Sequence, residues 1–230
     1  MHARHRLLLP LLPLPCAAAS ARVLRVGSWN RDQDPSTRAV ESLLGQAYAE
    51  LGQPVQFVER PLRRALVELL EGELDGNLMR AAAVIAEQGP QLLRVDPAVL
   101  LLHYWSYSLR PQPAPAQWAD LAGRRVAMLR GVLLIERQLP PSVRRLEAAT
   151  VPELQRLVER GVADLALTAE SRLSPPLLPL IDRQPCGFAP AALHHVLRQA
   201  HTELAQRLAT LLAGWQASGR LEALLRAKLY

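Results

Sequence analysis

Short apolar runs alternate with amphipathic stretches of roughly 10–15 residues along most of the chain, and this alternation constrains the fold more than any other feature. The expected strands are residues 23–27, 55–58, 74–78, 99–109, 125–129, 143–146 and 163–168. The main expected helices are residues 36–51, 62–71, 150–160 and 202–218. Strands that alternate with helices of this length form βαβ units, so we expect an α/β fold with a mostly parallel sheet flanked by helices.

A proline-rich segment divides this pattern into two parts. Pro111, Pro113 and Pro115 follow the long apolar and aromatic run 99–109, and the alternation restarts after them. Proline interrupts both helices and strands, so this segment is the best candidate for a domain boundary.

The first 21 residues have the pattern of a targeting segment. Arg4 and Arg6 precede an apolar run over residues 7–14, and Ala19-Ser20-Ala21 fits the small-x-small rule for cleavage. Cys16 suggests a lipoprotein signal, but the proline before it disfavours one. We therefore expect a cleaved secretory signal peptide over residues 1–21.

The positive charge does not indicate a nucleic-acid-binding surface. The formal net charge is +6, and Lys228 is the only lysine among the 27 lysine and arginine residues. The arginines are scattered singly or in pairs among acidic residues, without a block of like charge and without interleaved aromatic residues. An arginine-biased solvated surface explains the pattern better, and we expect no nucleic-acid partner.

The cysteines and histidines do not have the pattern of a metal site or of a catalytic thiol. The chain has two cysteines, too few for a four-cysteine zinc module, and Cys186 alone remains after the predicted signal peptide. Cys186 has no flanking catalytic signature, and an isolated thiol is more often inert. His194 and His195 are neighbours, so on a strand they would point to opposite faces and could not share one ion. We expect neither a metal nor a cofactor.

Six short segments, taken in order, resemble one family of proteins. Gly72-Glu-Leu-Asp75-Gly76, with Arg80 beyond it, is similar to a Gly-x-x-Asp-Gly-x-x-x-Arg segment, and residues 120–127 are similar to an Asp-Leu-x-Gly-Lys-x-Val-x segment. The other four segments are residues 23–29, 61–66, 161–164 and 193–204. Together they resemble the family-3 bacterial extracellular solute-binding proteins, and the likeness covers nearly the whole chain after residue 21.

This resemblance implies a two-lobed type II periplasmic-binding fold. Residues 22–107 and 187–230 would form lobe 1, residues 108–186 would form lobe 2, and two crossing strands, including 191–198, would form the hinge. The implied function is a periplasmic, non-enzymatic, monomeric protein that captures a small polar or anionic, amino-acid-like solute between its lobes. It would present the solute to a membrane permease of the ABC type or to a sensor.

The resemblance also implies which residues of lobe 1 and the hinge contact the ligand. Arg80 matches the arginine whose guanidinium pairs with a ligand carboxylate in two hydrogen bonds, and Arg64 is a second candidate. Trp29 follows the first strand, where the family places one wall of the cleft. Tyr104 and Trp105 lie at the hinge crossing, where an aromatic face can stack on a ligand, although strand alternation points them to opposite sides.

Two further candidates lie in lobe 2. Gly131 follows a strand and opens a helix, where free backbone N–H groups can hold an anion. Glu170 is the nearest acid to the position that should deliver a carboxylate for a ligand amine. Val132 and Ala169 replace the hydroxyl and the acid of amino-acid-binding members, and both departures weaken the case for an amino-acid ligand.

Two alternative functions remain open. An enzyme of the cyclohexadienyl dehydratase type shares this fold and would need a cleft acid that protonates a leaving group, for which Glu170 is the only candidate in lobe 2. The other alternative is a degenerate lobe pair that no longer binds a solute and that docks a partner through its surface. A cleft packed shut by side chains would support the latter.

Overall fold

The structure is a computed structural model that describes residues 22–29, 34–172, 174–179 and 181–227. The predicted signal peptide, residues 1–21, lies outside the described residues. The strands are β1 (Leu24–Ser28), β2 (Val55–Glu59), β3 (Gly76–Ala81), β4 (Leu92–Ser108), β5 (Arg125–Leu129), β6 (Arg144–Ala148), β7 (Leu165–Ser171), β8 (Asp182–Pro185) and β9 (Ala191–Arg198). The α-helices are α1 (Pro35–Glu50), α2 (Leu62–Glu71), α3 (Ala82–Glu87), α4 (Leu133–Glu136), α5 (Val151–Glu159), α6 (Thr202–Ala217) and α7 (Arg220–Arg226).

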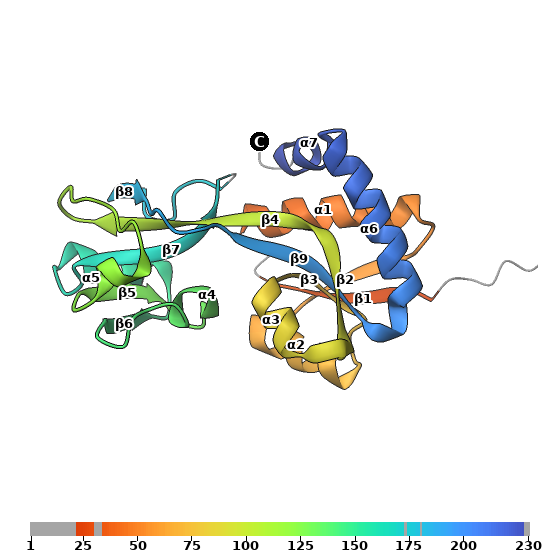
Figure 1. Cartoon of the computed structure of the whole chain (residues 1–230), viewed down its shortest axis with the longest axis horizontal. Coiled ribbons are helices and arrows are strands. Elements are labelled where there is room, and N and C mark those ends of the chain that lie inside the picture. The colour runs from red at the N-terminus through yellow and green to blue at the C-terminus, as the bar shows by residue number, and fades with distance from the viewer. Residues whose placement is uncertain (1–21, 30–33, 173, 180, 228–230) are drawn as a thin grey trace, which may run out of the picture.

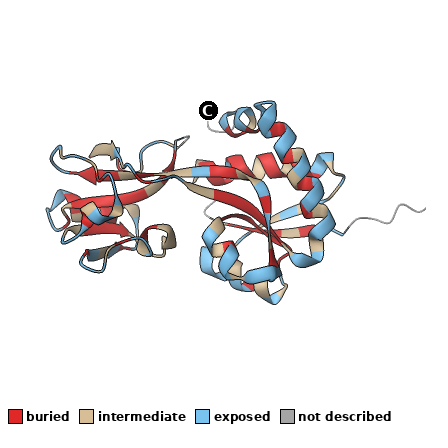
Figure 2. Cartoon of the chain, viewed as in Figure 1, coloured by how far each residue is buried: buried red, intermediate tan, exposed pale blue. Residues whose placement is uncertain are grey.

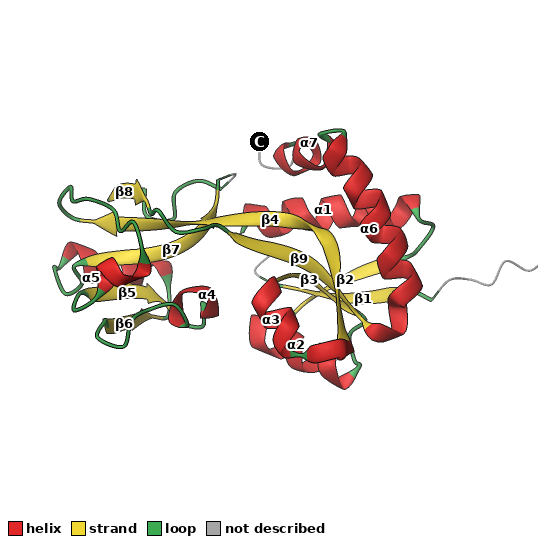
Figure 3. Cartoon of the chain, in the orientation of Figure 1, coloured by secondary structure: helices red, strands yellow, loops and turns green. Residues whose placement is uncertain are grey.

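The strands join into one sheet that passes through two lobes (Figures 1 and 3). Its order is β2-β1-β3-β9-β4-β7-β5-β6, with β8 paired to β4. At one end β1 pairs in parallel with β2 and β3, and at the other β5 pairs in parallel with β6 and β7. The antiparallel strands β4 and β9 lie between these parallel groups and connect them.

Strand β4 belongs to both lobes. Its residues Leu92 to Leu102 pair with β9 in lobe 1, and its residues Leu102 to Tyr107 pair with β7 in lobe 2. The chain therefore crosses between the lobes near Leu102, the residue at which the partner strand changes.

Each lobe has its own apolar core, visible as buried segments in Figure 2. In lobe 1, α1 and α6 pack on the sheet through side chains such as Leu43 and Leu208. In lobe 2, α5 packs on β5 and β7 through side chains such as Leu154. Tyr104, Tyr107 and Phe188, which the predicted limits assign to lobe 1, pack in the lobe 2 cores. The proline segment after β4 also lies in lobe 2, where Gly187 N–H donates to the Pro115 carbonyl (2.9 Å).

The predicted strands and helices agree well with the observed ones, including 191–198 as strand β9. The elements missed are α3, β8 and the first residues of β4. Helix α3 has only six residues, too few for a periodic pattern, β8 is polar, and Pro97 hides the start of β4. Asp34 caps α1, because it accepts from Ser36 N–H (2.9 Å) and from the Thr37 hydroxyl (3.0 Å).

Gly76 lies in β3 where a side chain has no room. A Cβ atom added to it would lie 2.6 Å from the Val196 carbonyl oxygen of β9 and 2.9 Å from a methyl group of Leu197. The two strands approach closely here, and the contact with backbone cannot be relieved by a rotamer change.

Gly76→Ala is expected to lower the free energy of unfolding by about 2 kcal/mol, since β3 and β9 would have to move apart. Urea denaturation followed by circular dichroism measures this. Gly214→Ala is the control: Gly214 is exposed on α6 with nothing within 4 Å of the added Cβ, so the variant should be unchanged or slightly stabilised. Equal effects at the two glycines would contradict the prediction.

A neutral histidine is buried in the core of lobe 1. The Nδ1 atom of His195 lies 3.0 Å from the Leu78 carbonyl oxygen, and its Nε2 atom lies 2.7 Å from the Tyr48 hydroxyl. A carbonyl only accepts, so Nδ1 carries the proton and Nε2 accepts from Tyr48. Burial lowers the pKa of His195 to about 4 and raises that of Tyr48.

This burial predicts a stability that falls as the solution is acidified. Between about pH 6.5 and pH 4 the unfolded chain takes up a proton at His195 that the folded protein excludes, so the free energy of unfolding should fall by up to about 3 kcal/mol across that interval. Urea denaturation at several pH values measures the slope. His195→Gln should reduce the dependence of the free energy of unfolding on pH. An equal slope in the variant would assign the pH dependence to other groups.

Candidate ligand-binding cleft

A cavity of about 460 Å³ lies between the lobes. That volume falls within the range of about 300–1,000 Å³ typical of small-ligand sites. Lobe 1 contributes Trp29, which follows β1, and residues from α1, α2, β3, α3, β4 and β9. Lobe 2 contributes residues from the ends of β5 and β7, from α4 and from the segment after β7. The cleft is therefore open among the described residues rather than packed shut by side chains. The predicted site residues that line it are Arg80, Trp29, Gly131 and Glu170.

Arg80 presents a buried guanidinium to the cavity. Arg80 is 8% exposed. Its Nε atom donates to Asn77 Oδ1 (2.7 Å), and its Nη2 atom donates to the Leu62 carbonyl (2.6 Å). These bonds use two of the five N–H donors of an arginine and hold the fork in place. The ring of Trp29 also contacts the guanidinium, with Arg80 Cζ 5.2 Å from its centroid.

No carboxylate pairs with Arg80 among the described residues. Burial lowers the pKa of Arg80 to about 10, so the group stays protonated at neutral pH. A buried cation with free donors and no counter-ion is a natural receptor for an anion.

Glu170 is saturated by donors from its own lobe. It is 7% exposed, and its oxygens accept from the Tyr107 hydroxyl (2.8 and 3.0 Å), from Arg183 Nη2 (3.0 Å) and from the Thr168 hydroxyl. Burial and the charge of Glu170 together raise the pKa of Tyr107, which keeps its proton to donate. The carboxylate lines the cavity, but its oxygens already accept hydrogen bonds from donors of lobe 2.

The backbone N–H of Gly131 is also occupied. It donates to Oε1 of Glu136 (2.6 Å), the last residue of α4, and α4 has only four residues. Because this N–H already has an anionic acceptor, the geometry leaves Gly131 as a turn residue, with φ of 84°, rather than as an anion holder.

Three other predicted site residues lie away from the cavity. Arg64 is 68% exposed on α2 and pairs with Glu68 (2.6 Å). Tyr104 packs edge-on against Trp118 and Phe188 in lobe 2. Trp105 points to the opposite side of β4, as alternation predicts, and the guanidinium of Arg183 lies 3.6 Å from its ring centroid. Their burial or pairing follows from packing within one lobe, so none of the three faces a ligand in the cavity.

Among the described residues, His194, His195 and Cys186 show no metal-binding or catalytic arrangement. His194 Nδ1 lies 2.9 Å from Asp96 Oδ1, whereas His195 points into the core. Within the described part of the chain, no group of three or more potential ligands could hold a metal ion. Cys186 is half-buried, and burial raises its pKa to about 11, which keeps the thiol protonated.

Sequence reasoning missed the apolar walls of the cavity. Most lining side chains are aliphatic, from both lobes, including Leu62, Leu66, Leu102, Val132 and Leu134. Leu62, Leu66 and Leu102 belong to elements that the periodicity predicts, but the pattern alone does not distinguish a core side chain from one that lines a cavity.

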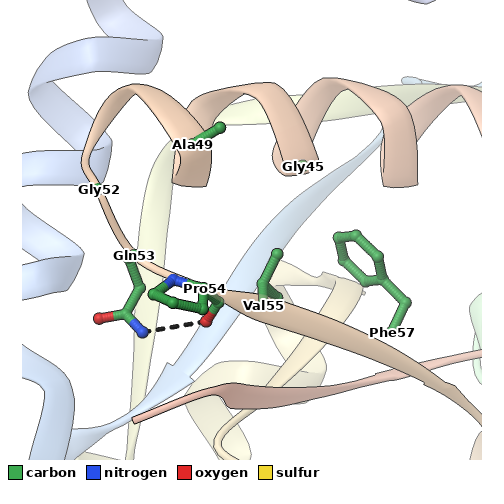
Figure 4. A pocket seen from close by; sticks show the side chains of 7 residues that line it. All are labelled: Gly45, Ala49, Gly52, Gln53, Pro54, Val55 and Phe57. Carbon is green, nitrogen blue, oxygen red and sulfur yellow. Dashed lines mark hydrogen bonds between the residues drawn. The ribbon is translucent and has the colours of Figure 1, made fainter. Parts of the chain in front are cut away.

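A second hollow, of about 430 Å³, lies between the end of α1 and the edge strand β2 (Figure 4). Gln53 is the only lining residue with a polar side chain, and its Nε2 atom already donates to the carbonyls of Arg22 (2.7 Å) and Pro54 (3.0 Å). The described lining therefore offers a ligand no charged side chain, and the cavity between the lobes is the better candidate site.

The lobes also contact each other beside the cavity. Arg137 at the end of α4 forms an ion pair with Glu87 of α3, and the hydroxyls of Ser36 and Ser174 lie 2.6 Å apart. Leu134 of α4 packs against the core of lobe 1. These contacts favour the arrangement in which the lobes enclose the cavity.

Glu87→Gln is expected to shift the protein toward a wider separation of the lobes, because it removes one charge of the pair. An exposed ion pair contributes about 0.2–1 kcal/mol, so the population change should be at most about fivefold. Pulsed electron paramagnetic resonance between spin labels on cysteines at Glu71 and Arg156, in a Cys186→Ser background, measures the distance distribution.

The control for this experiment is the double variant Glu87→Arg with Arg137→Glu, which restores opposite charges and should recover the original distribution. High salt should reduce the difference between the single variant and the unmodified protein. An unchanged distribution in Glu87→Gln at low salt would contradict a role for the pair.

No protein-family model matches the chain, and no curated protein matches it significantly. Solved structures, by contrast, match the chain in fold. A histidine kinase sensor domain with similarity to periplasmic binding proteins aligns with a TM-score of 0.68 at 22% identity, over 91% of this chain and 96% of that one. The periplasmic VFT2 domain of BvgS from Bordetella pertussis aligns with a TM-score of 0.65 at 16% identity, over 88% and 92%.

A third match is the amino acid ABC transporter substrate-binding protein AbpA from Streptococcus pneumoniae, solved with L-arginine. It aligns with a TM-score of 0.63 at 12% identity, over 90% of this chain and 94% of that one. At these identities the likeness concerns the fold. The fold implied by the sequence resemblance is confirmed: the chain has the two-lobed fold of the type II periplasmic binding proteins.

Proposed function

We propose that the protein is a periplasmic solute-binding protein that captures a small anionic solute between its lobes. The observation that carries the proposal is Arg80: a buried guanidinium at the cavity wall, fixed by Asn77 and Leu62, with donors left over and no acid to neutralise it among the residues that the structure describes. A ligand carboxylate would supply the missing counter-charge in a two-bond geometry that only an arginine offers.

The rest of the cleft supports a binding role. Trp29 covers the guanidinium and restricts its orientation, so little freedom is lost when a ligand arrives. The ion pair between Glu87 and Arg137 joins the lobes on the rim of the cavity. Two lobes that contact each other across a cavity in this way would bind a solute by closing around it.

The proposed location and partner rest on the sequence and on the matched folds. The predicted signal peptide would export the chain, and no helix of its described part is long and apolar enough to cross a membrane. The matched structures include both a sensor domain and an ABC transporter component. The solute-loaded protein would therefore be presented to an ABC-type permease or would act in a sensor.

The dehydratase alternative has less support. It requires a cleft acid that gives up a proton, and Glu170 accepts hydrogen bonds on both oxygens and pairs with Arg183. The non-binding alternative is weakened by the open cavity between the lobes.

Arg80→Gln is expected to weaken anion binding by about 10- to 100-fold, since a hydrogen bond to a charged group contributes about 1.5–3 kcal/mol. Thermal unfolding of the purified protein with acetate, succinate, 4-methylpentanoate, L-leucine, L-arginine, L-glutamate and putrescine would identify a ligand by its stabilising shift. Calorimetry with that ligand would then compare the variants.

Arg64→Gln is the matched control, because Arg64 is exposed on the neighbouring helix and outside the cavity. It should bind as the unmodified protein does. Circular dichroism checks that Arg80→Gln folds, and Arg80→Lys, which keeps the charge without the fork, should recover part of the affinity. If no member of the panel shifts the unfolding temperature, or if Arg80→Gln binds normally, the proposed function is wrong.

A further inference from the structure

We propose that the cleft selects a carboxylate with an apolar body and no ammonium group, rather than a zwitterionic amino acid. This inference rests on the proposed function, because it names the class of anion that Arg80 would hold. It depends on three properties of the cavity: its two arginines without an acidic partner, its hydrogen-bonded acids and its apolar walls.

Among the described residues, the charged side chains that line the cavity without an ion-pair partner are Arg80, Arg63 and Asp34, so positive charge predominates. Arg80 and Arg63 both line the cavity, and neither has a carboxylate partner among the described residues. Arg63 is exposed at the mouth, whereas Arg80 is buried. An anion gains from both, while a cationic group on the same ligand is repelled by both.

Among the described residues two acids line the cavity, and both already accept hydrogen bonds. Asp34 caps α1 through Ser36 N–H and the Thr37 hydroxyl. Glu170 accepts from Tyr107, Thr168 and Arg183. A ligand ammonium would lose its water shell on entering and would find these carboxylates committed to other donors.

Among the described residues, the neutral polar side chains that line the cavity are three serines, and none of them carries a charge that could balance an ammonium. The hydroxyls of Ser36 and Ser174 bond to each other (2.6 Å). On the wall of lobe 2, Val132 and Ala169 present carbon where a hydroxyl or a carboxylate would be needed to hold an ammonium. Burial of an unpaired charge is costly, so the site should discriminate against the amine.

The apolar walls favour the remaining part of the ligand. Leu62 and Leu66 of lobe 1 face the cavity together with Leu133, Leu134 and Leu177 of lobe 2, and all five are at least partly exposed. An aliphatic or aromatic body between them would remove its own surface and theirs from water, at about 0.8 kcal/mol for each buried CH₂.

The test compares ligands that differ only in the amine. Isothermal titration calorimetry on the purified protein would measure 4-methylpentanoate against L-leucine, which has the same carbon skeleton, and 3-phenylpropanoate against L-phenylalanine. The acid without the amine is expected to bind at least tenfold more tightly in at least one pair. The amine without the acid, 3-methylbutan-1-amine, is expected to give no binding.

A second variant tests the wall directly. Val132→Thr keeps the shape of the side chain but replaces a methyl group with a hydroxyl on the cavity wall, so it should weaken the binding of 4-methylpentanoate severalfold and reduce the selectivity over L-leucine. Val67→Thr makes the same change at an exposed valine outside the cavity and should leave both affinities unchanged.

The outcomes separate this inference from the proposed function. If amino acids bind as tightly as the amine-free acids, or only polar dicarboxylates bind, and that binding depends on Arg80, the proposed function stands and the selectivity for an apolar carboxylate is wrong. If no solute binds at all, both fail.

Discussion

Strand β4 is hydrogen-bonded to both lobes along one continuous length, and the rest of the architecture depends on it. Its first part pairs with β9 and its last part pairs with β7 and β8. Because Leu100 and Leu102 lie where the partner changes, the same residues form the connection and part of the cavity wall. The lobes can change their relative orientation only by bending this strand and the segment that leads into β9 (Figure 1). The geometry of the cleft is thus set by backbone pairing, and its chemistry is left to side chains at the ends of the neighbouring elements.

Sequence reasoning predicted the elements well because the signals for them are local. Hydrophobic periodicity identified α1, α5 and α6, and short apolar runs beside glycines identified β1 and β3. The short helix α3 and the proline-containing start of β4 carry no such signal. Lobe limits were harder to predict, because the change of partner strand at Leu102 is a property of long-range pairing and leaves no mark in the local pattern.

The candidate site was predictable only in part, again because long-range contacts leave no mark in the local sequence pattern. Arg80 could be proposed from a motif, but whether it has an acidic partner depends on where every carboxylate of the chain lies. Glu170 was a reasonable candidate until the structure brought Tyr107 and Arg183, 63 and 13 residues away, to its oxygens. Gly131 lost its free N–H to Glu136, five residues on. Whether a polar group is available to a ligand is a statement about its competitors, and these come from distant parts of the sequence.

The division of labour between the lobes bears on how a ligand would close them. A ligand shifts the balance between open and closed forms only by interactions that differ between the two forms. Arg80 and Trp29 both belong to lobe 1, so a carboxylate would bind them in either form and contribute little to closure. The wall of lobe 2 is mainly apolar, so closure would add the packing of the ligand body against side chains such as Val132, Leu134 and Leu177. At about 0.8 kcal/mol for each buried CH₂, two such groups change the equilibrium by roughly tenfold, which exceeds the contribution of an exposed ion pair such as Glu87 with Arg137. In this protein, therefore, the charge would fix the ligand and its apolar part would drive closure.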